Sequence, residues 1–224
     1  MELRPFYLHA LASRMTMIVA KVMLALVLVN CSTRPSRLYV LSSQANSSSV
    51  SRDGSEVRAE GNISARSPNA GKNGDEHRFG VTVTVPEYLD RLDVVRRTSE
   101  NVLQPNYNVQ WGEGLAVTAT RALAEDLAGL LPFADFMSMP SRTRQMIDFQ
   151  IHLDLDRFES EANGVSVLVG RWTVTDSAGN ERASGRVSRN EPLEKKNDSE
   201  AMAAAMSRNL WTVSVEIAEV CRQL

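Results

Sequence analysis

The chain has 224 residues, of which 43% are hydrophobic and 23% are charged, a balance typical of a globular protein. This length favours one domain with a substantial core over two domains. The formal net charge of -2 gives no electrostatic reason to expect a nucleic-acid partner.

Residues 1–30 have the order of regions that defines a secretory signal peptide. Arg14 and Lys21 supply a basic region, and the apolar run from Val22 to Val29 follows it. This run is too short for a membrane-spanning helix, which needs about 20 mostly apolar residues. We therefore predict that residues 1–30 are removed, which leaves a mildly acidic mature chain.

Cys31 is the predicted attachment point of a lipid anchor. Leu28-Val29-Asn30-Cys31 resembles a lipobox, in which a leucine stands three places before a cysteine that becomes diacylated. Asn30 departs from the small residue that usually precedes this cysteine. Each buried acyl CH2 contributes about 0.8 kcal/mol to membrane binding, so several acyl chains hold a domain firmly. Residues 31–36 then form the lipidated N-terminus and its spacer, and the absence of an aspartate after the cysteine favours the outer membrane.

The second cysteine, Cys221, falls on the apolar side of a predicted helix, where a thiol behaves as a small buried hydrophobe. If lipid occupies Cys31, Cys221 has no partner for an intramolecular disulfide. The alternative, a disulfide between Cys31 and Cys221, leaves the apolar run before Cys31 unexplained.

The composition changes sharply after the first predicted strand, Leu38 to Leu41. From Ser42 to about residue 76 the chain is rich in Ser, Asn, Gly, Arg and Glu and has no hydrophobic periodicity. Such a segment buries too little apolar surface to fold. We therefore predict a disordered insertion at about 42–76 within a domain that spans residues 37–224. A binding patch built from its arginines is the alternative.

A strand, a turn and a hairpin follow the predicted insertion. Phe79 to Val85 alternates between large apolar and smaller residues, which predicts a strand that Pro86 ends. Glu87 to Arg91 then forms a turn or a single helical turn. Val94-Val95 and Val102-Leu103 flank a polar stretch, so we predict a β-hairpin there.

Two helices and three strands are predicted in the second half. Apolar residues recur at helical spacing from Leu115 to Leu130, with Asp126 off that stripe. From Ile147 to Leu155 every odd residue is apolar and every even residue is polar, which predicts a strand with one face in the core.

Strands from Val165 to Thr175 and from Arg182 to Arg189 follow, joined by a polar turn. A long helix from about Ser199 to Arg222 closes the chain, and Asn197 and Asp198 are its capping candidates. The order of elements predicts an α/β single domain with a mixed β-sheet covered by two main helices.

The sequence offers one candidate metal site and no catalytic motif. His152, Asp154 and Asp156 lie at two-residue intervals, so on a strand they share a face and could bind a metal ion. Alternation with core residues already explains their polarity, so we expect no metal and no cofactor. The chain has no GxSxG element, no glycine-rich phosphate loop and no histidine placed as the base of a hydrolase triad. We therefore expect no enzymatic activity.

Three segments together resemble the PqiC/YmbA family of ABC-type transport auxiliary lipoproteins. They are Cys31 with the spacer that leads to Leu38-Tyr39-Val40-Leu41, VTVTVPEYLDRLDVVRR from Val81 to Arg97, and NVQWGEGL from Asn108 to Leu115. The most specific piece is Pro86 to Arg91, which lies between two valine-rich strands. The similarity covers most of the mature chain, although after Phe133 only the order of elements carries it.

The resemblance implies a non-enzymatic outer-membrane lipoprotein with a periplasmic α/β domain. Such a protein works with an MCE-domain protein and an inner-membrane permease to move lipids between the two membranes. The resemblance also implies a ring-like homo-oligomer that serves as a docking collar for an MCE tube. A stand-alone envelope assembly or structural lipoprotein is the alternative function, and an enzyme with an unrecognised site is a third.

Aromatic residues beside a proline turn often anchor interfaces, and this chain has such residues beside Pro86. Tyr88, Leu89 and Trp111 are the resulting candidates for a partner interface. Packing of the same side chains in the domain core is the preferred alternative.

Overall fold

The computed structural model describes residues 37–45, 77–141 and 146–224. Residues 37–224 belong to one compact unit. The predicted signal peptide, Cys31 with its spacer, and residues 46–76 of the predicted insertion lie outside the described residues. Those three assignments therefore stay predictions.

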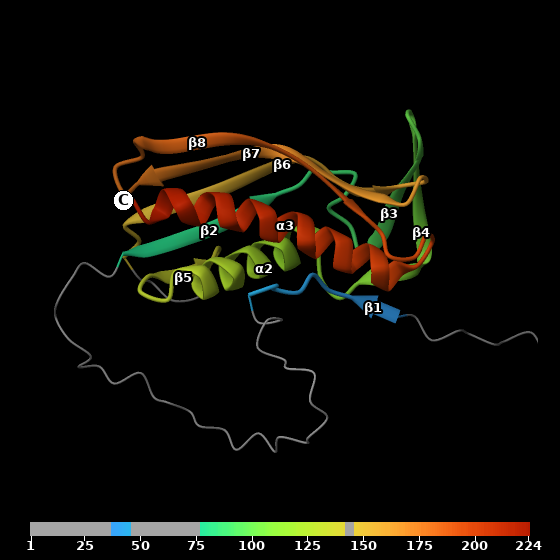
Figure 1. The fold of residues 1–224 in the computed structure, drawn as a ribbon, viewed down its shortest axis with the longest axis horizontal. Coiled ribbons are helices and arrows are strands. Elements are labelled where there is room, and N and C mark those ends of the chain that lie inside the picture. The colour runs from blue at the N-terminus through green and yellow to red at the C-terminus, as the bar shows by residue number, and fades with distance from the viewer. Residues whose placement is uncertain (1–36, 46–76, 142–145) are drawn as a thin grey trace, which may run out of the picture. The chain divides into compact units, whose positions relative to one another are not determined.

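The described residues form one eight-stranded sheet and two helices (Figure 1). The helices lie on the same side of the sheet, with α2 against β2 and β5 and α3 against β6, β7 and β8. This arrangement confirms the predicted α/β class, a single domain whose mixed sheet is covered by two helices. The elements are β1 (Arg37–Tyr39), β2 (Arg78–Thr84), β3 (Asp93–Ser99), β4 (Val102–Trp111), α2 (Leu115–Leu130), β5 (Asp135–Ser138), β6 (Phe149–Glu161), β7 (Val165–Asp176), β8 (Glu181–Pro192) and α3 (Ser199–Cys221).

Strand β6 is the centre of the sheet because three other strands pair with it. β7 pairs with it in the antiparallel direction along almost its whole length. On the other edge, β2 runs parallel to the first half of β6, and β3 runs parallel to its end, where Arg96 and Arg97 pair with Ser160 and Glu161. Together β2 and β3 act as one long strand that is interrupted by the segment 85–92.

A β-bulge at Asp156 breaks the alternation that predicts β6. The register with β7 shifts between Leu155 and Arg157, so the faces exchange at that point. After the shift, Phe158 faces the core and is fully buried, whereas Glu159 points to the opposite face. Gly170 of β7 lies against the bulge. A Cβ atom at this position would be 2.2 Å from the carbonyl oxygen of Asp154, so a side chain has no room there.

Both helices bury the apolar stripes that their sequences predict. The residues of both stripes are 1% exposed or less. They are Leu115, Ala119, Leu123 and Leu127 of α2 and Met206, Leu210, Val213 and Ile217 of α3. Asp198 is the N-cap of α3, where its side chain accepts hydrogen bonds from the backbone N–H groups of Glu200 and Ala201 at 3.0 and 2.9 Å. Burial raises the pKa of the Cys221 thiol to about 12, in agreement with the predicted buried cysteine. Neither of the two described helices has the length and apolar character needed to cross a membrane.

Asp126 differs from its prediction, because it is fully buried although it lies off the apolar stripe of α2. Its Oδ1 atom accepts hydrogen bonds from Ser43 Oγ at 2.7 Å and from the backbone N–H of Gln44 at 2.8 Å. Its Oδ2 atom accepts a hydrogen bond from Ser214 Oγ of α3 at 3.2 Å. Asp126 therefore joins both helices to the segment after β1. Ser43 and Gln44, which lie in the stretch predicted as disordered, are thus bound to the domain.

Burial raises the pKa of Asp126, against the opposing effect of its hydrogen bonds from Ser43 and the neighbouring groups. A carboxyl group whose pKa is higher in the folded state than in the unfolded state stabilises the fold at low pH. That contribution is lost as the pH rises from the unfolded value through the raised folded value.

We expect Asp126→Ala to lower the free energy of unfolding by about 1–3 kcal/mol, because buried donors lose their acceptor. Asp126→Asn keeps an acceptor and cannot ionise. Its free energy of unfolding should therefore rise relative to that of the wild type as the pH rises above about 4. Urea unfolding at several pH values measures both effects. Glu125→Ala, on the exposed face of the same helix, is the control and should change stability by less than about 0.5 kcal/mol. Equal effects of the two alanine substitutions would contradict the role assigned to Asp126.

Candidate functional site

The segment 85–92 leaves the sheet between β2 and β3 and forms a compact turn. The backbone N–H of Leu89 donates to the carbonyl oxygen of Pro86 at 2.8 Å, and that of Asp90 donates to the same oxygen at 3.2 Å. Pro86 has no N–H group for a neighbouring strand, which explains why β2 ends before it. Leu89 is 3% exposed and packs in the core, so its side chain attaches the turn to the core.

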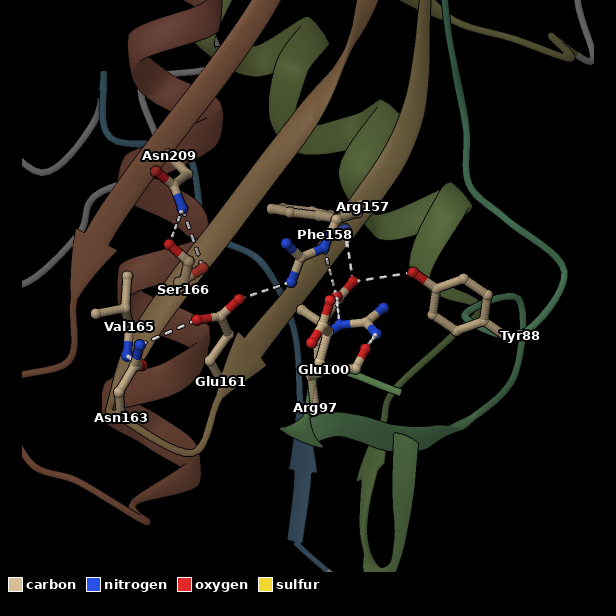
Figure 2. Close-up of polar contacts among 11 residues, drawn as sticks. Tyr88, Arg97, Glu100, Arg157, Phe158, Glu161, Asn163, Val165, Ser166 and Asn209 are labelled. Carbon is tan, nitrogen blue, oxygen red and sulfur yellow. Dashed lines mark hydrogen bonds and ion pairs between the residues drawn. The ribbon is translucent and has the colours of Figure 1, made fainter. Parts of the chain in front are cut away.

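The carboxylate of Glu159 attaches the same turn to β6, and no part of its side chain is exposed. Its Oε1 atom accepts hydrogen bonds from Arg97 Nε at 2.8 Å and from Arg157 Nε at 2.9 Å (Figure 2). Its Oε2 atom accepts hydrogen bonds from Tyr88 Oη and from the backbone N–H of Phe158, both at 3.1 Å. Two charged and two neutral donors therefore occupy both oxygens of this buried carboxylate.

Further contacts extend this network toward the end of β6. Arg157 Nη2 donates to Glu161 Oε1 at 2.8 Å, and Arg97 Nη1 donates to the carbonyl oxygen of Glu100 at 2.9 Å. We call Tyr88, Arg97, Arg157, Glu159 and Glu161 the Glu159 cluster. A cavity of about 500 Å³ lies beside it, lined by residues of β3, of the β3–β4 turn, of the end of β6 and of the β6–β7 turn.

The charges in the Glu159 cluster stabilise one another. Burial and the negative charge of Glu159 raise the pKa of the Tyr88 hydroxyl, which therefore stays a hydrogen-bond donor. The hydrogen bond to Glu159 raises the pKa of Arg97, and the hydrogen bond from Arg157 lowers the pKa of Glu161. Arg97 and Glu161 thus keep their usual charges at neutral pH. The cluster holds the turn against β6.

The structure places the three candidate interface residues differently. Leu89 and Trp111 are each 3% exposed and belong to the core, as the core-packing alternative requires. Tyr88 is half-buried, and its hydroxyl is directed into the Glu159 cluster. The outer side of the same turn is formed by other residues, of which Leu92 is 52% exposed. A partner that touches this turn would therefore meet Leu92 and its neighbours before Leu89 or Trp111.

The candidate metal residues His152, Asp154 and Asp156 lie exposed along β6. His152 Nε2 is 3.6 Å from Asp154 Oδ1, which is a contact between two side chains on one face. Asp156 is the residue of the bulge and has no partner in the register with β7. Within residues 37–45, 77–141 and 146–224, no group of three or more His, Cys, Asp or Glu side chains is arranged to hold a metal ion.

Sequence analysis did not identify Glu159, Arg97 or Arg157 as members of a site. The alternation that predicts β6 ends at Leu155, and the bulge then moves Glu159 to an unexpected position in the pattern. A usable signal was present in RFE, from Arg157 to Glu159, because two opposite charges that flank a phenylalanine in a strand share a face and can pair.

The sequence matches a family model, and the fold is similar to solved structures. Residues 60–218 match the model of a family described as an ABC-type transport auxiliary lipoprotein component. No curated protein sequence matches this chain. The crystal structure of an uncharacterized protein aligns with a TM-score of 0.56 at 21% identity, covering 64% of this chain and 91% of that chain. The crystal structure of a DUF330 protein from Xanthomonas campestris aligns with a TM-score of 0.52 at 16% identity, covering 66% of this chain and 86% of that chain. These two likenesses concern the fold.

We expect Glu159→Ala to lower the free energy of unfolding by about 3 kcal/mol, because it leaves two partly buried guanidinium groups without their shared carboxylate. Tyr88→Phe removes one neutral hydrogen bond and should cost about 1 kcal/mol. Urea unfolding at neutral pH measures both changes. Glu87→Ala, on the exposed side of the same turn, serves as the control. A loss for Glu159→Ala no larger than that for Glu87→Ala would show that the Glu159 cluster does not stabilise the fold.

Proposed function

Because this chain belongs to the ABC-type transport auxiliary lipoprotein family, we propose that it is the lipoprotein subunit of an MCE-type lipid transporter. The family match over residues 60–218 is the observation that carries this proposal. The protein is thus an accessory component of a transport system, and the proposal adds the kind of transporter. Its partners are an MCE-domain protein and an inner-membrane permease, and together they move lipids between the two membranes.

The proposed subunit has a binding role and no enzymatic one. In the described part of the chain, the most strongly connected charged residues form the Glu159 cluster, and each of them is engaged by another protein group. Such a cluster fits a domain that presents a rigid surface to partners. A ring-like homo-oligomer that surrounds the MCE protein is part of the same proposal.

Cys31 is the proposed lipid anchor, and the outer membrane is the proposed location, with the domain on the periplasmic side. The support comes from the lipobox-like sequence Leu28-Val29-Asn30-Cys31 and from the lipoprotein family match. The spacer between Cys31 and the first strand, β1 at Arg37, is only a few residues long. A chain extends at most about 3.6 Å per residue, so this spacer keeps the domain within about 20 Å of its anchor.

We expect Cys31→Ala to move the protein from the outer-membrane fraction to the soluble periplasmic fraction, because it removes the acyl chains that bind the membrane. Fractionation of cells with density-separated membranes measures this shift. Cys221→Ala is the control. The thiol of Cys221 is buried and has no role in the proposed lipidation, so this variant should stay in the membrane fraction. A Cys31→Ala protein that remains firmly bound to membranes would refute the anchor.

The outer side of the segment 85–92 is the proposed contact with the MCE-domain protein, with Tyr88 holding it in place. Leu92 is a large exposed hydrophobic residue at this position, and Arg91 beside it is 42% exposed in its side chain. Interfaces are often anchored by such residues at the centre of a contact. Leu92 is therefore a better test of the surface than Leu89 or Trp111, whose substitution would disturb the core.

We expect the wild-type protein, isolated from native membranes, to recover an MCE-domain protein and a permease, and we expect Leu92→Asp to reduce this recovery. A charge at a desolvated contact opposes binding, while stability should change little because Leu92 is exposed. Affinity isolation with mass spectrometry measures the recovery, and Val215→Asp on the exposed side of α3 is the matched control. Recovery with outer-membrane assembly proteins or peptidoglycan alone would instead favour a stand-alone envelope lipoprotein.

A further inference from the structure

A second cavity lies on the other side of the β3–β4 hairpin from the Glu159 cluster. Its volume is about 490 Å³, and it is bounded by the hairpin and by the segment that precedes α3. The polar residues that matter for its chemistry are Arg96, Gln104, Asn106, Tyr107, Asn108 and Asn197. We call it the Arg96 cavity.

Arg96 and Arg97 are consecutive on β3, so their side chains point to opposite faces of the strand. Arg97 is neutralised by the buried carboxylate of Glu159. Arg96 instead donates from Nη1 to Oδ1 of Asn197 at 3.0 Å, a neutral acceptor. No carboxylate of the described residues lies within the 4.0 Å of an ion pair with Arg96. The guanidinium of Arg96 therefore has no ion-pair partner among the described residues.

Two asparagines in the lining of the Arg96 cavity use their side-chain oxygens as acceptors. Asn197 must use its oxygen toward Arg96, because a guanidinium group can only donate. Asn106 must use its oxygen toward the backbone N–H of Asn108, at 3.2 Å, for the same reason. Both asparagines thus keep their NH2 groups for another acceptor. The partners of these amides fix the orientation, which otherwise would be ambiguous.

The charge balance separates the Arg96 cavity from three other cavities of the described residues. The cavity beside the Glu159 cluster has two arginines and two glutamates in its lining. A cavity of about 580 Å³ on β6, β7 and β8 has two arginines and two aspartates. A third, of about 660 Å³ beside α2, has Arg121, whose Nη1 pairs with Glu113. The Arg96 cavity has a cation and no acidic residue in its lining.

We propose that the Arg96 cavity binds a phosphate ester. Arg96 supplies the positive charge, and the NH2 groups of Asn106 and Asn197 supply further donors to the phosphate oxygens. A tetrahedral phosphate accepts hydrogen bonds from several directions, which suits donors that come from a strand and from a separate loop. The volume of about 490 Å³ leaves room for an alcohol such as glycerol attached to the phosphate. This site goes beyond the proposed function, since it does not require any transport partner.

Ligand-observed 31P NMR of glycerol 3-phosphate, with the full chain purified in a neutral detergent, tests the site. Binding should broaden the phosphate resonance, and Arg96→Gln should weaken the affinity by about tenfold to a hundredfold, the usual range for a hydrogen bond to a charged group. Arg186→Gln, which removes an exposed arginine of β8, should leave the affinity unchanged. Equal broadening with the wild type and with Arg96→Gln, or none with the wild type, would overturn the proposal.

A second variant guards against an effect on folding. Asn106→Asp retains the oxygen that accepts from the N–H of Asn108, and it places a negative charge inside the cavity. It should abolish binding of glycerol 3-phosphate while thermal unfolding stays close to that of the wild type. Unchanged binding by a folded Asn106→Asp protein would contradict the proposed site.

Flotation with lipid vesicles distinguishes two sources of the phosphate, a lipid headgroup and a soluble phosphate ester. The Cys31→Ala chain, which has no anchor in the proposed scheme, is floated with vesicles of phosphatidylglycerol or of phosphatidylcholine. Flotation with phosphatidylglycerol that depends on Arg96 identifies a lipid headgroup as the ligand. Binding of glycerol 3-phosphate without such flotation identifies a soluble phosphate ester. Because this experiment contains no other subunit of the proposed transporter, its failure is independent of a failure of the proposed transport function.

Discussion

The fold depends on how one edge of β6 is filled. Two strands, β2 and β3, share that edge, and the segment 85–92 leaves it between them. A strand edge without a partner exposes backbone groups that must be satisfied in another way. Here the carboxylate of Glu159 accepts the N–H of Phe158, and it also holds Tyr88 of the turn and two arginines. The Glu159 side chain therefore replaces a strand partner for the N–H of Phe158. It also fixes the segment 85–92, whose departure from the sheet leaves that edge of β6 open.

Two carboxylates are buried among the described residues, and they are satisfied by different chemistry. Glu159 has two guanidinium partners, whereas the side-chain and backbone groups that donate to Asp126 are all neutral. Burial raises the pKa of Asp126, so its contribution to stability is lost as the pH rises. The two groups also act at different places. Glu159 fixes the middle of the sheet, and Asp126 fixes the chain that enters the domain.

Hydrophobic periodicity predicted those helices and strands in which the same spacing of apolar residues continues along the element. The stripes of α2 and α3, the β3–β4 hairpin and the first half of β6 are such parts, and the structure confirms them. Strand β5 has four residues, too few for a period of two to be recognised. The end of β6 follows a bulge that inverts its pattern, so the position of Glu159 could not be derived. Asp126 was misplaced because helical spacing reports the apolar stripe and cannot reveal a polar contact with a segment over 80 residues away.

Strand β1 has a mechanical consequence if Cys31 carries the anchor. Any pull between the membrane and the domain then enters the fold at Arg37, the first residue of β1. Three residues of β1 pair with β4, and the backbone N–H of Gly112 donates to the carbonyl oxygen of Tyr39 at 2.7 Å. Behind this short ladder, the hydrogen bonds of Leu41 to Thr118 and of Ser43 to Asp126 hold the chain to α2. Tension would therefore be resisted in two successive stages. The pairing of β1 with β4 would break first, and the buried hydrogen bonds to Thr118 and Asp126 would still hold the domain to its anchor.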